Sequence, residues 1–148
     1  MHIWVDADAC PGEIKELLYR AAQRQKIKLT LVANQSLRIP RSEFIATLLV
    51  GDGANIADRR IVELAMPGDL VVTADIPLAA DVVAKGAEAI DPRGGLYTQA
   101  NIGERLAMRN VLDQLRGGGH IGGGPAHFGP KDRQAFANQL DRWLVKHK

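Results

Sequence analysis

Short apolar runs alternate with amphipathic stretches along the first 91 residues of this 148-residue chain. Several of the runs are almost continuously apolar, which is typical of strands that are covered on both faces. The predicted strands are Ile3–Val5, Lys28–Val32, Phe44–Val50, Leu70–Thr73 and Ala87–Ile90. Such an alternation of strand and helix favours a parallel sheet with right-handed crossovers. The pattern therefore predicts an α/β domain, a three-layer α/β/α arrangement with a mostly parallel five-stranded sheet.

Helix signals lie between most of these strands. Pro11 suits the first position of a helix that runs to about Gln25, and Pro77 can open a helix before the last strand. Between the third and fourth strands, apolar residues recur at helical spacing at Ala57, Ile61, Leu64 and Ala65. The polar segment Ala33–Ser42 contains Pro40 and gives the weakest prediction.

The last third of the chain carries two further amphipathic stretches, Asn101–Leu115 and Asp132–Lys146. Their apolar faces are formed by Met108, Val111, Leu112 and Leu115 in the first and by Phe136, Leu140, Trp143 and Leu144 in the second. Neither helix could bury its apolar stripe alone, so we predict that both pack on the sheet. We therefore expect one domain over residues 1–148, with a core at 1–91 and a helical extension at 92–148.

A glycine-rich segment, Gly117–Gly124, joins these two helices and has His120 at its middle. It can be a flexible linker, or it can be a mobile lid or phosphate-facing loop whose amides contact a substrate. Its spacing matches neither the Walker A motif nor the dinucleotide-binding fingerprint, so we infer no nucleotide cofactor.

Composition and charge narrow the class of protein. The single cysteine, Cys10, excludes an intramolecular disulfide, and we find neither a signal peptide nor an apolar run long enough to span a membrane, so we expect a cytoplasmic protein. The net charge of +2 permits a nucleic-acid partner without demanding one. The part of the chain from Arg93 onward is mainly basic, which is typical of a solvated surface and also suits phosphate binding.

Polar side chains follow every predicted strand. The first strand is followed by Asp6 and Asp8, and the others are followed by Asn34, Asp52, Asp75 and Asp91. The carboxyl ends of parallel strands meet at one edge of a sheet, where ligands of open α/β folds bind. Any one of these residues could instead cap the helix that follows. Two neighbouring acids are more than a single cap needs, so Asp6 and Asp8 carry the stronger functional signal.

Carboxylates brought together repel one another unless a cation neutralises them. Oxygen ligands favour Mg²⁺ or Mn²⁺, and the scattered histidines form no zinc motif. Asp58 is a further candidate ligand, in the first turn of the helix after the third strand. Because such ions stabilise the displacement of phosphate esters, phosphoester hydrolysis is the expected reaction class.

Several segments together resemble the uncharacterised bacterial YaiI/YqxD family. They are Trp4–Pro11 (WVDADACP), Val32–Gln35 (VANQ), Gly51–Asp58 (GDGANIAD), Gly68–Ala79 (GDLVVTADIPLA), Asp91–Gly94 (DPRG) and Gly122–Pro125 (GGGP). That family is similar in turn to the PIN-like nucleases. The resemblance implies a parallel sheet of strand order 3-2-1-4-5 and an acidic metal site at Asp6, Asp58 and Asp75, with Asp8 as an additional acid.

These signals lead to a Mg²⁺- or Mn²⁺-dependent phosphodiesterase acting on RNA or DNA as the expected function. Asp6, Asp8, Asp58 and Asp75 would be the catalytic, metal-binding residues, and Asn34 and Arg93 would position substrate.

Two other functions stay open. A domain that binds nucleic acid or protein without catalysis could hold phosphates through Arg93, Arg105 and Arg109. A phosphatase of the haloacid dehalogenase type would use Asp6 as the nucleophile and Asp8 as the acid and base, but Cys10 occupies the place of the threonine in that motif.

Overall fold

The computed structural model describes residues 1–53, 55–117 and 127–147, and it shows a six-stranded sheet with five α-helices and one 3-10 turn in those ranges. The strands are β1 (His2–Asp6), β2 (Lys28–Ala33), β3 (Ile45–Leu49), β4 (Leu70–Val72), β5 (Glu88–Ile90) and β6 (Leu96–Tyr97). The helices are η1 (Ala7–Ala9), α1 (Gly12–Gln25), α2 (Ile56–Leu64), α3 (Ile76–Ala84), α4 (Ile102–Gly117) and α5 (Pro130–Lys146).

The strand order is β3-β2-β1-β4-β5-β6. The first five strands are parallel, so the predicted sheet and its order 3-2-1-4-5 are confirmed. The sixth strand is a departure from the prediction. It pairs antiparallel with β5 through Ala89 with Tyr97 and Ile90 with Leu96. A strand of two residues is too short to show the alternation that marks strands in a sequence.

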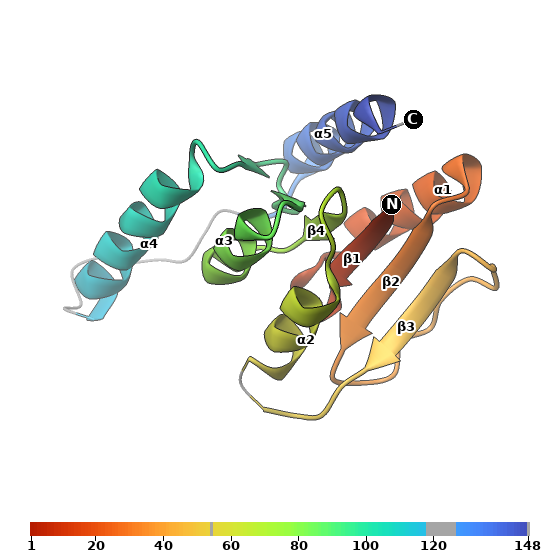
Figure 1. Ribbon diagram of the computed structural model, residues 1–148, viewed down its shortest axis with the longest axis horizontal. Coiled ribbons are helices and arrows are strands. Elements are labelled where there is room, and N and C mark those ends of the chain that lie inside the picture. Colours follow the sequence, from red (N-terminus) through yellow and green to blue (C-terminus); the bar gives the residue numbers. More distant parts are fainter. Residues whose placement is uncertain (54, 118–126, 148) are drawn as a thin grey trace.

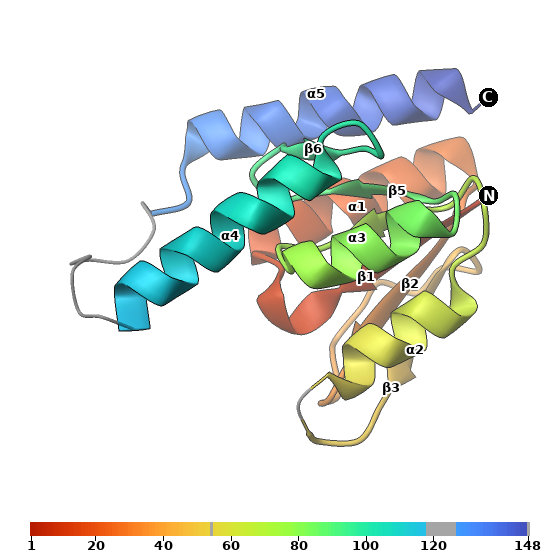
Figure 2. The same ribbon diagram turned by 60° about the vertical axis from the view of Figure 1, so that its left-hand side comes forward.

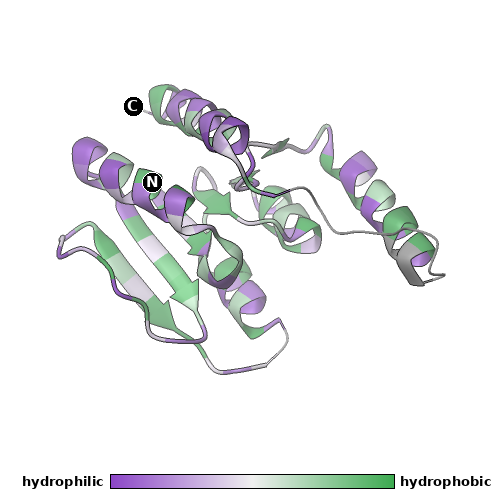
Figure 3. Ribbon diagram, turned by 180° about the vertical axis from the view of Figure 1, so that it is seen from behind, coloured by the Kyte–Doolittle hydropathy of each residue, from purple (hydrophilic) through white to green (hydrophobic). Residues whose placement is uncertain are grey.

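Helices cover both faces of the sheet, as a parallel sheet requires. Strand residues such as Ile3, Val5 and Leu31 pack against α1 and α5 on one face. On the other face Val32, Val71 and Ala89 pack against α2 and α3. These two clusters give the three-layer α/β/α arrangement (Figure 1 and Figure 2). Figure 3 shows the strands mostly in the hydrophobic colours, with both colours on the helices.

One buried carboxylate joins β1 to β4 at their amino ends. Asp69 accepts hydrogen bonds from the backbone N of His2 at 3.1 Å, the indole Nε1 of Trp4 at 3.1 Å and the backbone N of Met66 at 2.9 Å. Three donors compensate for burying this side chain, which is only 5% exposed. The contacts hold β1 and β4 side by side, so that the residues after their carboxyl ends also lie close together.

The helix α4 corrects one prediction. We expected its apolar stripe to pack on the sheet, but Met108, Val111 and Leu115 are 57%, 50% and 41% exposed. The helix lies against α3 (Figure 2). Its first residue, Ile102, packs on the apolar cluster to which α3 also contributes. In contrast, α5 buries Phe136, Leu140, Trp143 and Leu144 as predicted.

Two expectations concern other parts of the chain. The glycine-rich segment with His120 lies outside the described residues, apart from Gly117 at the end of α4. No helix within the described ranges is long and apolar enough to cross a membrane.

Candidate functional site

One hydroxyl joins the side chain of Asp6 to the backbone of Asp75. Thr73 Oγ1 donates to Asp6 Oδ2 at 3.0 Å and accepts from the backbone N of Asp75, also at 3.0 Å. Thr73 is 1% exposed and follows β4, whereas Asp6 is 8% exposed and ends β1. The hydroxyl therefore fixes the ends of two adjacent strands relative to each other. We did not single out Thr73 from the sequence, because a threonine at a strand end is common in any sheet.

Asp75 is the N-cap of α3, as one reading of its position before Pro77 predicted. Its Oδ1 accepts from the backbone N of Leu78 at 3.0 Å, and Pro77 stands in the first turn. This cap fixes the carboxyl group at the N-terminus of α3, where the helix dipole favours negative charge. Capping through Oδ1 does not engage Oδ2, so a structural role and a functional role are compatible in this residue.

Asp58 comes from a third segment, the first turn of α2. The helix is entered through Asn55, whose φ of 68° is left-handed, a conformation that asparagine tolerates better than most residues. The pKa of Asp58 is raised from 3.8 to about 6. Burial is the largest cause, followed by repulsion from Asp75, a hydrogen bond between these two carboxyl groups, and repulsion from Asp6. The three acids therefore share one electrostatic environment.

The pKa of Asp6 is also raised, and Asp75 is a cause in both cases. Burial raises the pKa of Asp6, the hydrogen bond from Thr73 opposes this, and repulsion from Asp75 and then Asp8 adds to the increase. A carboxylate that is destabilised by other carboxylates has a higher affinity for a cation that neutralises them.

Asp8 and Asn34 lie at the same edge of the sheet but in a more exposed place. Asp8 is in η1, and its Oδ2 accepts from the backbone N of Asn34 at 3.1 Å. The bond joins the turn after β1 to the loop after β2. The structure thus brings Asn34 to the acidic edge, with its side chain exposed to solvent.

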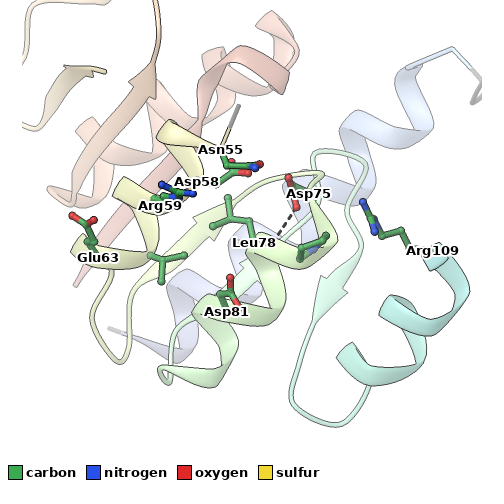
Figure 4. Close-up of a pocket in the computed structure, with 10 residues that line it drawn as sticks. Asn55, Asp58, Arg59, Glu63, Asp75, Leu78, Asp81 and Arg109 are labelled. Carbon is green, nitrogen blue, oxygen red and sulfur yellow. Dashed lines mark hydrogen bonds between the residues drawn. The ribbon is translucent and has the colours of Figure 1, made fainter. Parts of the chain in front are cut away.

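A cavity of about 540 Å³ opens beside Asp58 and Asp75, between α2, α3 and α4. Its charged lining consists of four acids, Asp58, Glu63, Asp75 and Asp81, and two arginines, Arg59 and Arg109. In Figure 4, Asp75 lies between Asp58 on one side and Arg109 on the other.

The buried Asp6 and the exposed Asp8 are not among the residues that line the cavity. The sequence did not point to Arg59, because an arginine beside a helical acid usually belongs to a solvated face.

Arg93 is not brought to this cavity. Its Nη1 lies 2.9 Å from Asp132 Oδ2 at the start of α5, and its guanidinium lies 5.8 Å from the ring centre of Phe128. The structure therefore gives Arg93 a role in attaching α5, and substrate positioning stays a prediction. Asp91 also makes structural contacts. Its carboxylate stabilises the turn after β5 by accepting hydrogen bonds from the backbone N of Arg93 at 2.6 Å and from the hydroxyl of Tyr97 at 3.2 Å.

Cys10 is buried, and burial raises the pKa of its thiol to about 12. Its Sγ donates to the backbone carbonyl of Pro11 at 3.7 Å. A thiol with such a pKa is unreactive at neutral pH, so the geometry favours a packing role for Cys10.

The candidate metal ligands are all carboxylate oxygens, which are the type of donor that a hard divalent cation prefers. It does not form a ready-made cage. Within the described ranges, no three acidic, histidine or cysteine side chains are grouped closely enough to hold a metal ion as they lie. Mg²⁺ typically keeps several waters and uses only one or two carboxylates together with substrate phosphates, so a pair of acids is sufficient for it.

The raised pKa of Asp58 leads to a stability prediction. The folded state holds a proton on this group more tightly than the unfolded state does, so the penalty on folding is absent below about pH 4, grows as the pH rises, and is complete above about pH 6. Asp58→Asn should therefore increase the free energy of unfolding at pH 7.5, without divalent metal, by about 1 kcal/mol after a discount for partial exposure. Urea titrations at pH 7.5 and pH 4 measure the gain and its disappearance.

The matched control is Asp52→Asn, which changes the same charge at an exposed position outside the cavity. It should leave the free energy of unfolding within about 0.5 kcal/mol of the wild type at both pH values. An equal gain from both variants would show that general charge, and not the acidic site, destabilises the protein.

Comparisons with known proteins place the chain among close relatives. The family model described as "Uncharacterized BCR, YaiI/YqxD family" matches residues 4–146. The chain is 60% identical over 146 residues to the UPF0178 protein of Dechloromonas aromatica (strain RCB), across 99% of this chain and 97% of that protein. It is 58% identical over 146 residues to the UPF0178 protein YaiI of Escherichia coli O81 (strain ED1a), across 99% and 96%. No solved structure gives a match.

Proposed function

Since the chain belongs to the YaiI/YqxD family, whose description states no activity, we propose its function from the site itself: a Mg²⁺- or Mn²⁺-dependent phosphodiesterase that acts on RNA or DNA. The proposal includes a cytoplasmic location, which the single cysteine favours.

One observation carries the proposal. Asp6, Asp58 and Asp75 come from three separate segments, yet charge on Asp75 adds to the burial that raises the pKa of both Asp6 and Asp58. A fold that only needed caps and turns would not gather charges that weaken it. Acidic clusters of this kind are typical of sites where function is favoured over stability.

We assign each residue a role from its position. Asp6 and Asp75, held together by Thr73, would be the principal ligands of the ion, and Asp58 and Asp8 would contribute directly or through water. The bound cation would neutralise the carboxylates and stabilise the negative charge that develops on the phosphate oxygens. The cavity next to Asp75 would receive the phosphodiester. Asn34 would contact the part of the nucleic-acid strand that extends out of the cavity.

A binding role without catalysis is the second candidate. It is favoured by the structural hydrogen bonds that the acids already make, from Leu78 to Asp75 and from Asn34 to Asp8. Under this reading, nucleic acid would bind with a clear salt dependence and would not be cleaved.

Incubation of the wild-type protein with 5′-labelled mixed single-stranded RNA and DNA distinguishes the two functions. We expect shorter products with Mn²⁺ or Mg²⁺ and none with EDTA. Binding of the oligonucleotides without any products would reject catalysis and favour the second candidate. Trapping an acyl phosphate on Asp6 would instead indicate a phosphatase of the haloacid dehalogenase type.

A further inference from the structure

Two guanidinium groups line the cavity that contains Asp58 and Asp75. Arg59 belongs to α2 and Arg109 belongs to α4, and α3 lies between these two helices in both overall views (Figure 1 and Figure 2). Figure 4 shows the two arginines on opposite sides of Asp75. A group that enters the cavity beside Asp75 would therefore have a guanidinium group on each side.

The charges of the cavity are unbalanced. Four carboxylates and two guanidinium groups leave an excess of negative charge. A phosphodiester, which is itself negative, would be repelled from such a cavity unless cations oppose the carboxylates. A divalent ion near Asp75 would supply part of that charge, but it would lie on one side of the phosphate only. A guanidinium on the other side would complete the neutralisation.

Of the two arginines, Arg109 is the better placed for this role. Arg59 is the immediate neighbour of Asp58 on α2 and shares its wall of the cavity, whereas Arg109 faces Asp75 from the far wall (Figure 4). The guanidinium of Arg109 has contacts within the protein, including a hydrogen bond from Nη1 to Asn110 Oδ1 at 3.2 Å. A planar group with five donors can contact protein and phosphate at the same time, or exchange a surface contact for a charged phosphate.

The position of α4 supports the same reading. This helix lies on α3 and leaves Met108, Val111 and Leu115 largely exposed, so burial of its apolar stripe does not explain where it lies. Its location does place Arg109 at the wall of the cavity. The extension that follows the five parallel strands thus adds a cation to a site whose acids all come from the core.

We propose that Arg109 is a substrate-binding residue, delivered by α4, whose guanidinium holds the phosphate of a nucleic-acid strand across the cavity from Asp75. The inference rests on the proposed function for the identity of the ligand. It assigns phosphate binding to the helical extension and cation binding to the core.

The test measures oligonucleotide binding separately from cation binding and from cleavage. The probe is a fluorescein-labelled short oligothymidylate, followed by anisotropy in Ca²⁺ buffer at several salt concentrations. The variants are Arg109→Gln, Arg109→Lys and the control Arg133→Gln, which removes the same charge from an exposed position on α5. Calorimetric titration with Mn²⁺ is carried out on all of them.

We expect Arg109→Gln to weaken oligothymidylate binding about tenfold and to reduce the salt slope by about 1. Arg109→Lys should recover part of the affinity, because it restores the charge but not the two-pronged geometry. Arg133→Gln should bind within about twofold of the wild type. Mn²⁺ affinity should not fall in any variant, because none of the substitutions removes a carboxylate or adds positive charge.

Equal affinities for Arg109→Gln and Arg133→Gln would overturn the assignment, and so would a wild-type protein that does not bind the probe. Failure of the proposed catalysis has a different signature. The wild type would bind oligothymidylate through Arg109 and produce no cleavage products in Mn²⁺, which keeps the phosphate-binding residue and rejects the hydrolase.

Discussion

The double variant Asp6→Asn/Asp75→Asn will lose Mn²⁺-dependent cleavage, with a rate at least about 1,000-fold below that of the wild type. A metal ion contributes several kcal/mol to the stabilisation of a phosphoryl transition state, and each 1.4 kcal/mol corresponds to a factor of ten. Both substitutions remove a charged ligand and keep the shape of the side chain. Initial rates on a labelled oligonucleotide measure the loss.

Misfolding would not explain this loss, because asparagine preserves the local hydrogen bonds. Its amide oxygen can accept from Thr73 at position 6, and asparagine is as good an N-cap as aspartate at position 75. Removing two mutually repelling charges should leave the melting temperature at or above that of the wild type. The same exchange at the exposed Asp52 is the control and should leave the rate unchanged. Full cleavage by the double variant would rule out these acids as ligands.

Gly94→Ala will destabilise the protein by about 3 kcal/mol, the largest effect we expect from a single methyl group. The φ of Gly94 is +96°, a region that costs an L-residue roughly 1–2 kcal/mol. A Cβ there would lie 2.6 Å from the backbone carbon of Ala135 and 2.8 Å from the backbone N of Phe136. Overpacking of this kind typically costs about 1–3 kcal/mol, because α5 would have to move away from the turn. Urea unfolding of the variant measures the change.

Gly68→Ala separates the two causes. Gly68 has a similar φ of +88°, but a Cβ at this position meets no atom within 4 Å. It should therefore cost only about 1–2 kcal/mol, which is the backbone strain alone. If both variants lost the same stability, the close approach of the Gly94 turn to α5 would not contribute.

The sheet and its acidic edge could be predicted because both depend on local patterns. A buried parallel strand is apolar throughout, and the residue after it necessarily lies at the carboxyl edge of the sheet. Asp6, Asp8 and Asn34 followed from that rule alone. Asp58 was a candidate from its place in the first turn of the helix after the third strand, and the family resemblance implied the same residue. The position of Asp75 allowed both a cap and a functional role, and the structure shows that it is a cap.

Other features depend on contacts between distant segments, which a single sequence does not reveal. The ion pair of Arg93 is an example, because its partner Asp132 is 39 residues away. The stripe on α4 has the spacing of a buried helix, yet the sheet is already covered by α2 and α3 on that side. The cavity lining was invisible for the same reason, since α2, α3 and α4 contribute to it and their relative positions are set by tertiary packing.

Calorimetric titration with Mn²⁺ tests the central claim most directly, which is that Asp6, Asp58 and Asp75 form a cation site. The wild-type protein and the Asp6→Asn/Asp75→Asn variant are titrated at pH 7.5, where Asp58 is largely ionised. We predict binding by the wild type and at least a tenfold weaker affinity in the variant, since two of the ligand charges are gone. Equal Mn²⁺ affinity in the two proteins would contradict the account.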